Sequence, residues 1–286
     1  HGRDRRQRQM CIRDRSVTAA YATTPVLREV SFDIHRGRTV AVVGESGSGK
    51  STAARCITGL LPPLSGQVLN NGNPLPASFR QRNREQLRQI QMIYQMADTA
   101  LNPRMKISEI IGRPVEFYLG LTGNEKKKRV FQLLEQIELD PAQYYNRLPT
   151  ELSGGQKQRI GIARALAAEP EFIICDEVTS ALDQLVAEGI LKLLAKLQDQ
   201  MDLAYMFITH DLSTVRAIAD EVVVMKDGEV VESGAKNKMF KPPHHPYTDL
   251  LLSSVPEMDE NWLDELLDQR GVENIGDAAV SKMAGN

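Results

Sequence analysis

The sequence has 286 residues, of which 42% are apolar and 25% are charged, and its formal net charge is −2 at pH 7. A chain of this length and composition can bury a substantial core, which excludes a disordered protein. Residues 1–15 carry six arginines and two aspartates, a balance of +4, so residues 16–286 sum to −6. Non-specific affinity for duplex DNA depends on many Lys and Arg side chains that neutralise phosphates. We therefore expect no nucleic-acid partner.

Neither a membrane-spanning segment nor a disulfide framework is indicated. No apolar run reaches the roughly 18 residues that a spanning helix needs, and the N-terminus lacks the apolar stretch of a signal peptide. The chain is expected to stay in the cytoplasm. Cys11, Cys56 and Cys175 have no CxxC spacing, so we expect reduced, buried thiols rather than a zinc ribbon or disulfides.

The basic stretch RRQRQMCIRDR at residues 5–15 has two interpretations. Clustered like charge could form a disordered arm that binds phosphates. The stretch also matches, throughout its length, the translation of a transposase adapter used in sequencing libraries. We interpret residues 1–15 as a sequencing-adapter scar and exclude them from the fold, as one excludes a tag. On this interpretation the native N-terminus is missing, and a strand at the edge of the core is lost, replaced or frayed.

The first half of the remaining chain predicts strands around one helix. Residues 25–34 alternate apolar and polar side chains, and residues 66–72 end in an Asn-Gly turn signal, so both are expected in antiparallel strands. Between them, TVAVV at 39–43 is a β-branched apolar run typical of a buried strand, and the residues after Lys50 have a helical pattern.

A helical insert is predicted over residues 107–168. Apolar side chains at helical spacing mark one helix face, and Asp140 followed by Pro141 is a helix start with an N-cap and a proline at the first position. The run EKKKR at 125–129 is most simply the solvated face of a helix.

Buried strands return after the insert. FIICDE (172–177), LAYMFITH (203–210) and EVVVM (221–225) are short apolar runs, and apolar side chains at helical spacing lie between the first two. Strands that alternate with helices imply an α/β fold with a mainly parallel sheet. Residues after about 255 are acidic and weakly periodic, and we interpret them as a tail.

GESGSGKS at 44–51 fits the pattern G-x-x-x-x-G-K-[ST] and lies between a predicted strand and a predicted helix, the context that this motif requires. Its glycines let backbone N–H groups point inward as a nest for phosphates at a helix N-terminus. Lys50 can reach the β- and γ-phosphates, and the Ser51 hydroxyl can bind Mg²⁺. We expect nucleotide to be bound by Gly44, Ser46, Gly47, Ser48, Gly49, Lys50, Ser51 and Thr52.

The string LSGGQ at 152–156 is the second specific motif. With the phosphate-binding loop before it and FIICDE after it, the chain resembles the ATP-binding subunit of an ATP-binding-cassette (ABC) transporter over residues 16–253. The resemblance implies a P-loop NTPase (RecA-like) core, an antiparallel β subdomain and an inserted helical subdomain at about 104–168, with a C-terminal extension at 254–286. In this family the signature covers the γ-phosphate of an ATP held by the partner subunit. The residues concerned here are Ser153, Gly154, Gly155 and Gln156.

Two adjacent carboxylates end the strand FIICDE, and such a pair can divide the work of holding a metal and activating a water. They could also be ordinary surface groups at a strand end. By the resemblance, Asp176 supports Mg²⁺ and Glu177 is the general base. Asp183, in the string SALD, would contact the opposite subunit.

Three more assignments come from the resemblance. His210, after the strand ending in MFIT, would contact the γ-phosphate, and Gln95, after IQMIY, would bind Mg²⁺ or orient water. Tyr21 lies about where family members have an aromatic ring that stacks on adenine, although a core tyrosine would look the same in sequence.

The strings DTALNPR (98–104) and PPHHPYTDLLLSSVP (242–256) resemble the ATPases of dipeptide and oligopeptide importers. The resemblance implies a peripheral motor on the cytoplasmic face of the cell membrane. Its partners would be a second ATPase domain (a copy, a different subunit or a fused half), a transmembrane permease and, indirectly, an extracytoplasmic solute-binding protein. The alternatives are a soluble ABC ATPase of DNA repair or translation, and a non-catalytic ATP-binding scaffold.

Overall fold

The computed structural model describes residues 10–21 and 24–253. A six-stranded sheet has the order β11-β10-β4-β9-β8-β7. Its strands are β4 (Thr39–Val43), β7 (Ile90–Ile93), β8 (Phe172–Asp176), β9 (Ala204–Ile208), β10 (Glu221–Lys226) and β11 (Glu229–Ala235). All neighbours pair in parallel except β10 and β11, which are antiparallel. The predicted α/β fold with a mainly parallel sheet is confirmed.

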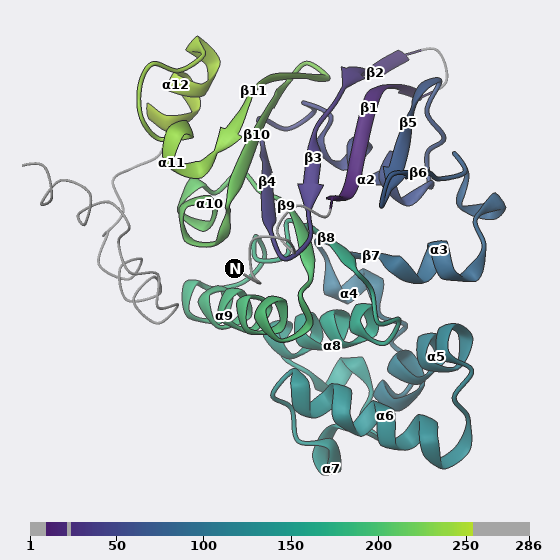
Figure 1. Ribbon diagram of the computed structural model, residues 1–286. Helices are drawn as coiled ribbons and strands as arrows, with labels where there is room; N and C mark the ends of the chain where they lie inside the picture. Colours follow the sequence, from purple (N-terminus) through teal and green to yellow (C-terminus); the bar gives the residue numbers. More distant parts are fainter. Residues whose placement is uncertain (1–9, 22–23, 254–286) are drawn as a thin grey trace, which may run out of the picture.

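A second, antiparallel sheet lies beside the first one (Figure 1). It contains β1 (Met10–Tyr21), β2 (Thr24–Val30), β3 (Asp33–His35), β5 (Ser65–Asn70) and β6 (Asn73–Pro74). The segment 25–34 forms two strands rather than one, because β2 pairs with the second half of β1 and β3 with its first half. The predicted turn is present: Asn71 and Gly72, between β5 and β6, have φ values of 49° and 80°.

The exclusion of residues 1–15 from the fold was wrong for residues 10–15, which form the first half of β1. Backbone pairing does not depend on side-chain identity, and here Ile12 to Arg15 pair with Asn70 to Gln67 of β5. Alternation along the strand also turns an apolar side chain inward, since Ile12 is only 1% exposed. Asp14 points inward by the same alternation and is 1% exposed as well. Residues 1–9 lie outside the described residues.

Helices cover the sheets and form a separate layer in the lower part of Figure 1. That layer contains α5 (Ile107–Leu119), α6 (Gly123–Gln136), α7 (Pro141–Tyr144) and α8 (Gly154–Leu166), as the helical insert predicted. As expected, Asp140 caps α7, accepting a hydrogen bond from the Ala142 N–H at 2.9 Å. The other helices are α2 (Lys50–Thr58), α3 (Arg84–Gln89), α4 (Ala97–Ala100), α9 (Gln184–Met201), α10 (Leu212–Ile218), α11 (Lys236–Met239) and α12 (Pro246–Ser253).

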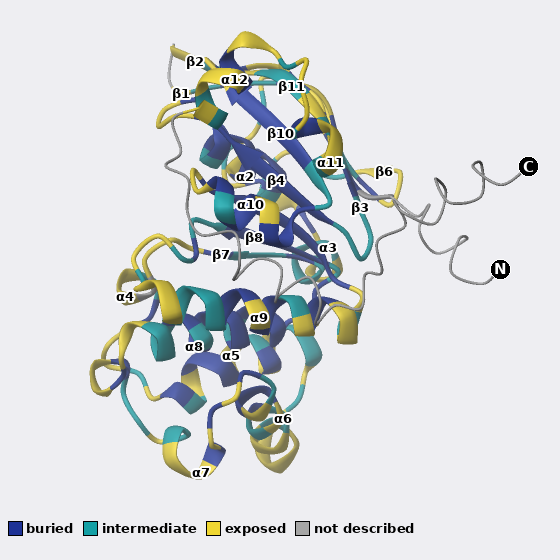
Figure 2. Cartoon of the chain, turned by 90° about the vertical axis from the view of Figure 1, so that its left-hand side faces the viewer, coloured by how far each residue is buried: buried dark blue, intermediate teal, exposed yellow. Residues whose placement is uncertain are grey.

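The helices leave the central strands of the main sheet buried, β4 and β9 fully and β8 and β10 almost fully (Figure 2). One apolar cluster joins the helical layer to β8 and β9, and a second joins α2 to both sheets. A third joins the faces of β4 and β10 to α10, α11 and α12. Because β4, β9 and β8 are adjacent and parallel, the loops that follow them meet at one edge of the sheet, where open α/β sheets bind ligands.

Candidate functional site

The loop after β4 turns into α2 at Lys50. Gly49, the N-cap of α2, has φ of 105°, and an added Cβ would lie 2.8 Å from Leu27 Cδ2, so only glycine fits there. Lys50 Nζ donates to Gly44 O at 2.8 Å and to Glu45 O at 2.7 Å, and it lies 3.3 Å from Ser48 Oγ. The ammonium is thus folded onto its own loop, at the start of a helix that attracts anions.

The charges around Lys50 oppose one another. Burial lowers the pKa of Lys50, while the carboxylates of Glu177, Asp176 and Glu45 act to raise it. Ser48, Lys50 and Thr52 are buried, whereas Ser46 and Gly47 are exposed at the rim of the loop. A phosphate entering the loop would meet a desolvated cation there.

Ser51 and Asp176 bring two oxygen donors together. Ser51 Oγ donates to Asp176 Oδ1 at 3.3 Å, joining the first turn of α2 to the end of β8. Burial raises the pKa of Asp176, the neighbouring Glu177 raises it further, and the Ser51 hydrogen bond acts to lower it. A hydroxyl and a carboxylate beside a phosphate-binding loop fit the oxygen ligands that Mg²⁺ prefers.

Glu177 lies directly after β8, between two side chains from other loops. Gln95 Nε2 donates to Glu177 Oε2 at 2.7 Å, and His210 Nδ1 lies 3.3 Å from Glu177 Oε1. Gln95 Nε2 also lies 3.4 Å from Ser180 Oγ. The three residues predicted as catalytic are therefore in contact, although they are 82 and 33 positions apart in sequence.

The backbone of Glu177 is also unusual, with φ of 48°, a value that non-glycine residues seldom adopt. Its N–H is held by Ile208 O of β9 at 2.9 Å. The sheet therefore maintains a costly conformation at this position, as is frequent at functional sites.

The signature LSGGQ forms the start of α8. Ser153 is its N-cap: Ser153 Oγ accepts from Gln156 N at 3.3 Å, and Gln156 Oε1 accepts from Ser153 N at 3.0 Å. The Gln156 amide also donates to Tyr144 OH at 2.9 Å. Gly155 lies so close to α9 that an added Cβ would be 2.4 Å from Val186 Cγ1.

Asp183 is the N-cap of the neighbouring helix α9, where its Oδ1 accepts from Val186 N at 3.0 Å. Ser153, Gly154 and Asp183 are exposed, so the starts of α8 and α9 present a polar surface to solvent. Val186 contacts both motifs: it lies close to Gly155 of the signature, and its N–H donates to Asp183.

Tyr21 lies at the end of β1 and is 40% exposed. Its hydroxyl accepts a hydrogen bond from Arg55 NH1 of α2 at 2.7 Å, and the Arg55 guanidinium lies 6.0 Å from the ring centroid. The ring is therefore placed beside α2 and open to solvent. Arg55 was not singled out from the sequence, because an arginine on a helix carries no signal of its own.

Two further contacts could not be predicted from the sequence. The segment 242–256, which contains HPYT, indicates no role for Tyr247, whose hydroxyl accepts a hydrogen bond from Glu45 N of the phosphate-binding loop at 3.0 Å. Tyr144, which holds Gln156, had no sequence signal.

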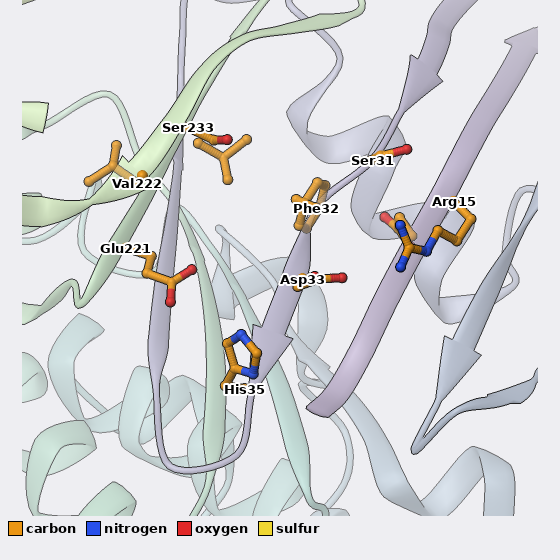
Figure 3. Close-up of a pocket in the computed structure, with 11 residues that line it drawn as sticks. Arg15, Ser31, Phe32, Asp33, His35, Glu221, Val222 and Ser233 are labelled. Atoms are coloured by element: carbon orange, nitrogen blue, oxygen red, sulfur yellow. The ribbon is translucent and has the colours of Figure 1, made fainter. Parts of the chain in front are cut away.

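A separate cavity of about 310 Å³ opens between β1, β3, β10 and β11 (Figure 3). Asp33 and His35 of β3 line it together with Arg15 and Glu221. None of the predicted site residues lines it, so it is distinct from the site described above.

Comparison with known proteins identifies the family. Residues 27–180 match the family model of the ABC transporter, more than half of the chain and including both glycine-rich motifs. The chain belongs to the ABC transporter family. Residues 231–278 match the C-terminal region of oligopeptide/dipeptide transporters. The resemblance seen in the sequence is thereby confirmed, and the protein is an ABC-type ATPase.

Relatives of this ABC ATPase have peptide-transport names. It is 44% identical to the oligopeptide transport ATP-binding protein OppF of Bacillus subtilis, over 84% of this chain and 79% of the relative. It is 41% identical to the dipeptide transport ATP-binding protein DppF of Haemophilus influenzae, over 81% of this chain and 71% of the relative.

Solved structures show the same ABC fold. cbiO1 of Clostridium perfringens, part of an ABC transporter complex, has a TM-score of 0.72 at 28% identity, covering 81% of this chain and 91% of its own. An ATP-binding cassette captured as a dimer with ADP and Pi has a TM-score of 0.67 at 31% identity, covering 78% of this chain and 98% of its own.

Proposed function

We propose that this ABC ATPase is the motor subunit of an importer for dipeptides or oligopeptides. ATP binding closes a head-to-tail pair of ATPase domains, in the simplest form two copies of this chain, and hydrolysis reopens it. A separate transmembrane permease converts this motion into transport. The support is the similarity to peptide-transport ATPases over both the ATPase core and the C-terminal region.

The observation that carries the catalytic part is the position of Glu177. Its carboxylate lies beside the phosphate-binding loop, within reach of Gln95 and His210. A carboxylate oriented by two neighbours can accept the proton of an attacking water, the role of a general base. Gln95 is suited to orient that water, and His210 to contact the γ-phosphate.

Lys50 is suited to bind the phosphates of ATP, and Ser51 and Asp176 are suited to bind the Mg²⁺ that accompanies them. Lys50 would leave the carbonyls of Gly44 and Glu45 for the β- and γ-phosphates. Ser51, Asp176 and Gln95 would hold Mg²⁺. A bound Mg²⁺ supplies charge neutralisation at the phosphates.

The signature is assigned to the ATP of the opposite domain. Ser153 and the N–H groups of Gly154 and Gly155 open α8, and a helix N-terminus favours an anion. Both Ser153 and Asp183 are exposed at the surface that would face the second domain. Tyr21 is assigned to adenine stacking. The support is its exposed ring, which lies beside α2, the helix that follows the phosphate-binding loop.

The place of action follows from the assigned role. Among residues 10–21 and 24–253, no helix is long and apolar enough to cross a membrane. As the proposed motor of an importer, the chain would act with a transmembrane permease, and we assign it to the cytoplasmic face of the cell membrane, with a solute-binding protein acting indirectly on the other side. The alternatives in DNA repair, translation or scaffolding gain no support from the relatives described above.

Paired variants test the catalytic assignment. Glu177→Gln removes the base but keeps the size of the side chain, so it should retain Mg-ATP binding and lose nearly all ATP turnover. Lys50→Ala should lose nucleotide affinity instead, because the phosphates lose their buried cation. Calorimetric binding and phosphate release would be measured on both variants. Turnover close to that of the wild type in Glu177→Gln would refute the assignment of the base.

A further inference from the structure

The α12 segment contacts the phosphate-binding loop directly. Tyr247 is only 4% exposed, and its ring packs in the apolar cluster that contains Val43, the last residue before the loop. Its hydroxyl accepts a hydrogen bond from the Glu45 N–H at 3.0 Å. Lys226 Nζ lies 4.9 Å from the centre of the ring, which helps to fix the ring's position.

One peptide group of the loop is therefore held from both sides. The Gly44 carbonyl accepts from Lys50 Nζ at 2.8 Å, while the N–H of the same peptide group, which belongs to Glu45, donates to Tyr247. Because a peptide group is planar, these two bonds fix the orientation of one plane. When Lys50 moves to a phosphate, Tyr247 is the side chain that still holds that plane.

The position of Tyr247 depends in turn on how α12 is attached. Glu232 of β11 accepts hydrogen bonds from the His245 N–H at 3.0 Å and from the Thr248 hydroxyl. The Tyr247 N–H donates to His245 Nδ1 at 3.2 Å. The turn between β10 and β11 contacts the same loop, since the Gly228 N–H donates to Ser48 O at 3.1 Å. The phosphate-binding loop is thus held by α12 and by the turn between β10 and β11, which bond to Glu45 and Ser48.

We infer that Tyr247 is a positioning residue for the phosphate-binding loop, and that α12 sets nucleotide affinity through it. The inference rests on the proposed binding of ATP at this loop. A loop whose N–H groups are held in place before the ligand arrives loses less conformational freedom on binding. Releasing the Glu45 peptide should therefore weaken nucleotide binding without changing any group that touches the phosphates.

The test compares three variants of the full chain. Tyr247→Phe keeps the ring and removes the hydroxyl, and Glu232→Gln weakens the attachment of α12. Tyr205→Phe is the matched control, because the buried Tyr205 hydroxyl donates to Leu194 O at 3.1 Å, a contact between β9 and α9. Calorimetry gives the affinity for Mg-ADP and Mg-ATP, hydrogen exchange gives the protection of the Glu45 amide, and circular dichroism confirms folding.

Tyr247→Phe should bind both nucleotides roughly two- to tenfold more weakly, the range expected for one ordinary hydrogen bond. Its KM for ATP should rise with kcat retained, and the Glu45 amide should exchange faster. Glu232→Gln should also bind both nucleotides more weakly. Tyr205→Phe should lose stability while keeping wild-type nucleotide affinity. Wild-type affinity in Tyr247→Phe, or an equal loss in Tyr205→Phe, would overturn the inference. A wild-type chain that binds no Mg-ADP would instead overturn the proposed function.

Discussion

The two oxygens of the Glu177 carboxylate have different partners, and this division suits a general base. Gln95 donates to one oxygen, and His210 lies beside the other. Asp176, one position earlier, is bonded to Ser51 instead. The order Asp-Glu was readable in the sequence, but the contacts with Gln95 and His210 were not, since they depend on which strands are neighbours. The resemblance to a known family supplied those assignments.

Asp14 is the residue whose burial the sequence did not predict. Burial in β1, and then the nearby Asp33 carboxylate, raise the pKa of Asp14 from 3.8 to about 8. Asp14 Oδ1 has no hydrogen-bond partner among the described residues. The folded state therefore keeps a proton that the unfolded state releases above pH 3.8, so the free energy of unfolding falls as pH rises from about 4 to about 8.

Asp14→Val should remove this pH dependence. The variant should have a larger free energy of unfolding than the wild type, and this advantage should be larger at pH 8 than at pH 5. The advantages at the two pH values should differ by on the order of a few kcal/mol. Urea unfolding of both proteins at the two pH values gives the difference, in which groups common to both proteins cancel. An advantage of the same size at both pH values would show that Asp14 is not buried as a neutral acid.

At the level of elements, the sequence predicts well where periodicity or a cap determines the structure. β4 occupies residues 39–43 as predicted, and Asp140 with Pro141 starts α7. Prediction from the sequence fails where strand pairing determines the structure. β1 includes residues 10–15, which had been excluded from the fold, and β11 was not predicted because its side chains are only partly buried. Close approaches between helices, such as that of Gly155 to Val186, carry no periodic signal either.

The contact between α8 and α9 gives a prediction with an internal control. Gly155→Ala should lower the free energy of unfolding by about 1–3 kcal/mol, because the new methyl group would lie 2.4 Å from Val186 Cγ1. Gly154→Ala should cost less, since its nearest neighbour would be Leu182 Cδ2 at 3.6 Å. Denaturant unfolding of both variants measures the difference.

A second change separates this clash from other effects. Val186→Ala in the Gly155→Ala background should restore most of the lost stability, because the shorter side chain makes room for the added methyl group. Strictly additive losses in the double variant would show that the two residues do not compete for the same space.

At the scale of the whole molecule, the residues assigned to nucleotide binding come from the loops at the sheet edge and from the starts of α8 and α9. The phosphate-binding loop, Glu177 and His210 meet at the edge of the parallel sheet, while Ser153 and Asp183 are exposed N-caps of α8 and α9. In the proposed head-to-tail pair, each complete site takes the loop from one domain and the signature from the other. Such an arrangement can be tested by mixing two defective chains.

The decisive measurement is ATP turnover in an equal mixture of Lys50→Ala and Ser153→Asp chains. The Lys50→Ala chain has a phosphate-binding loop that lacks its lysine. The second keeps a side chain that can cap α8 but places a negative charge against the phosphate. Each variant alone should be inactive. The mixture should regain about one quarter of wild-type turnover, because half of the randomly formed dimers are mixed and each of these has one intact site of two. A mixture as inactive as its components would contradict the shared site.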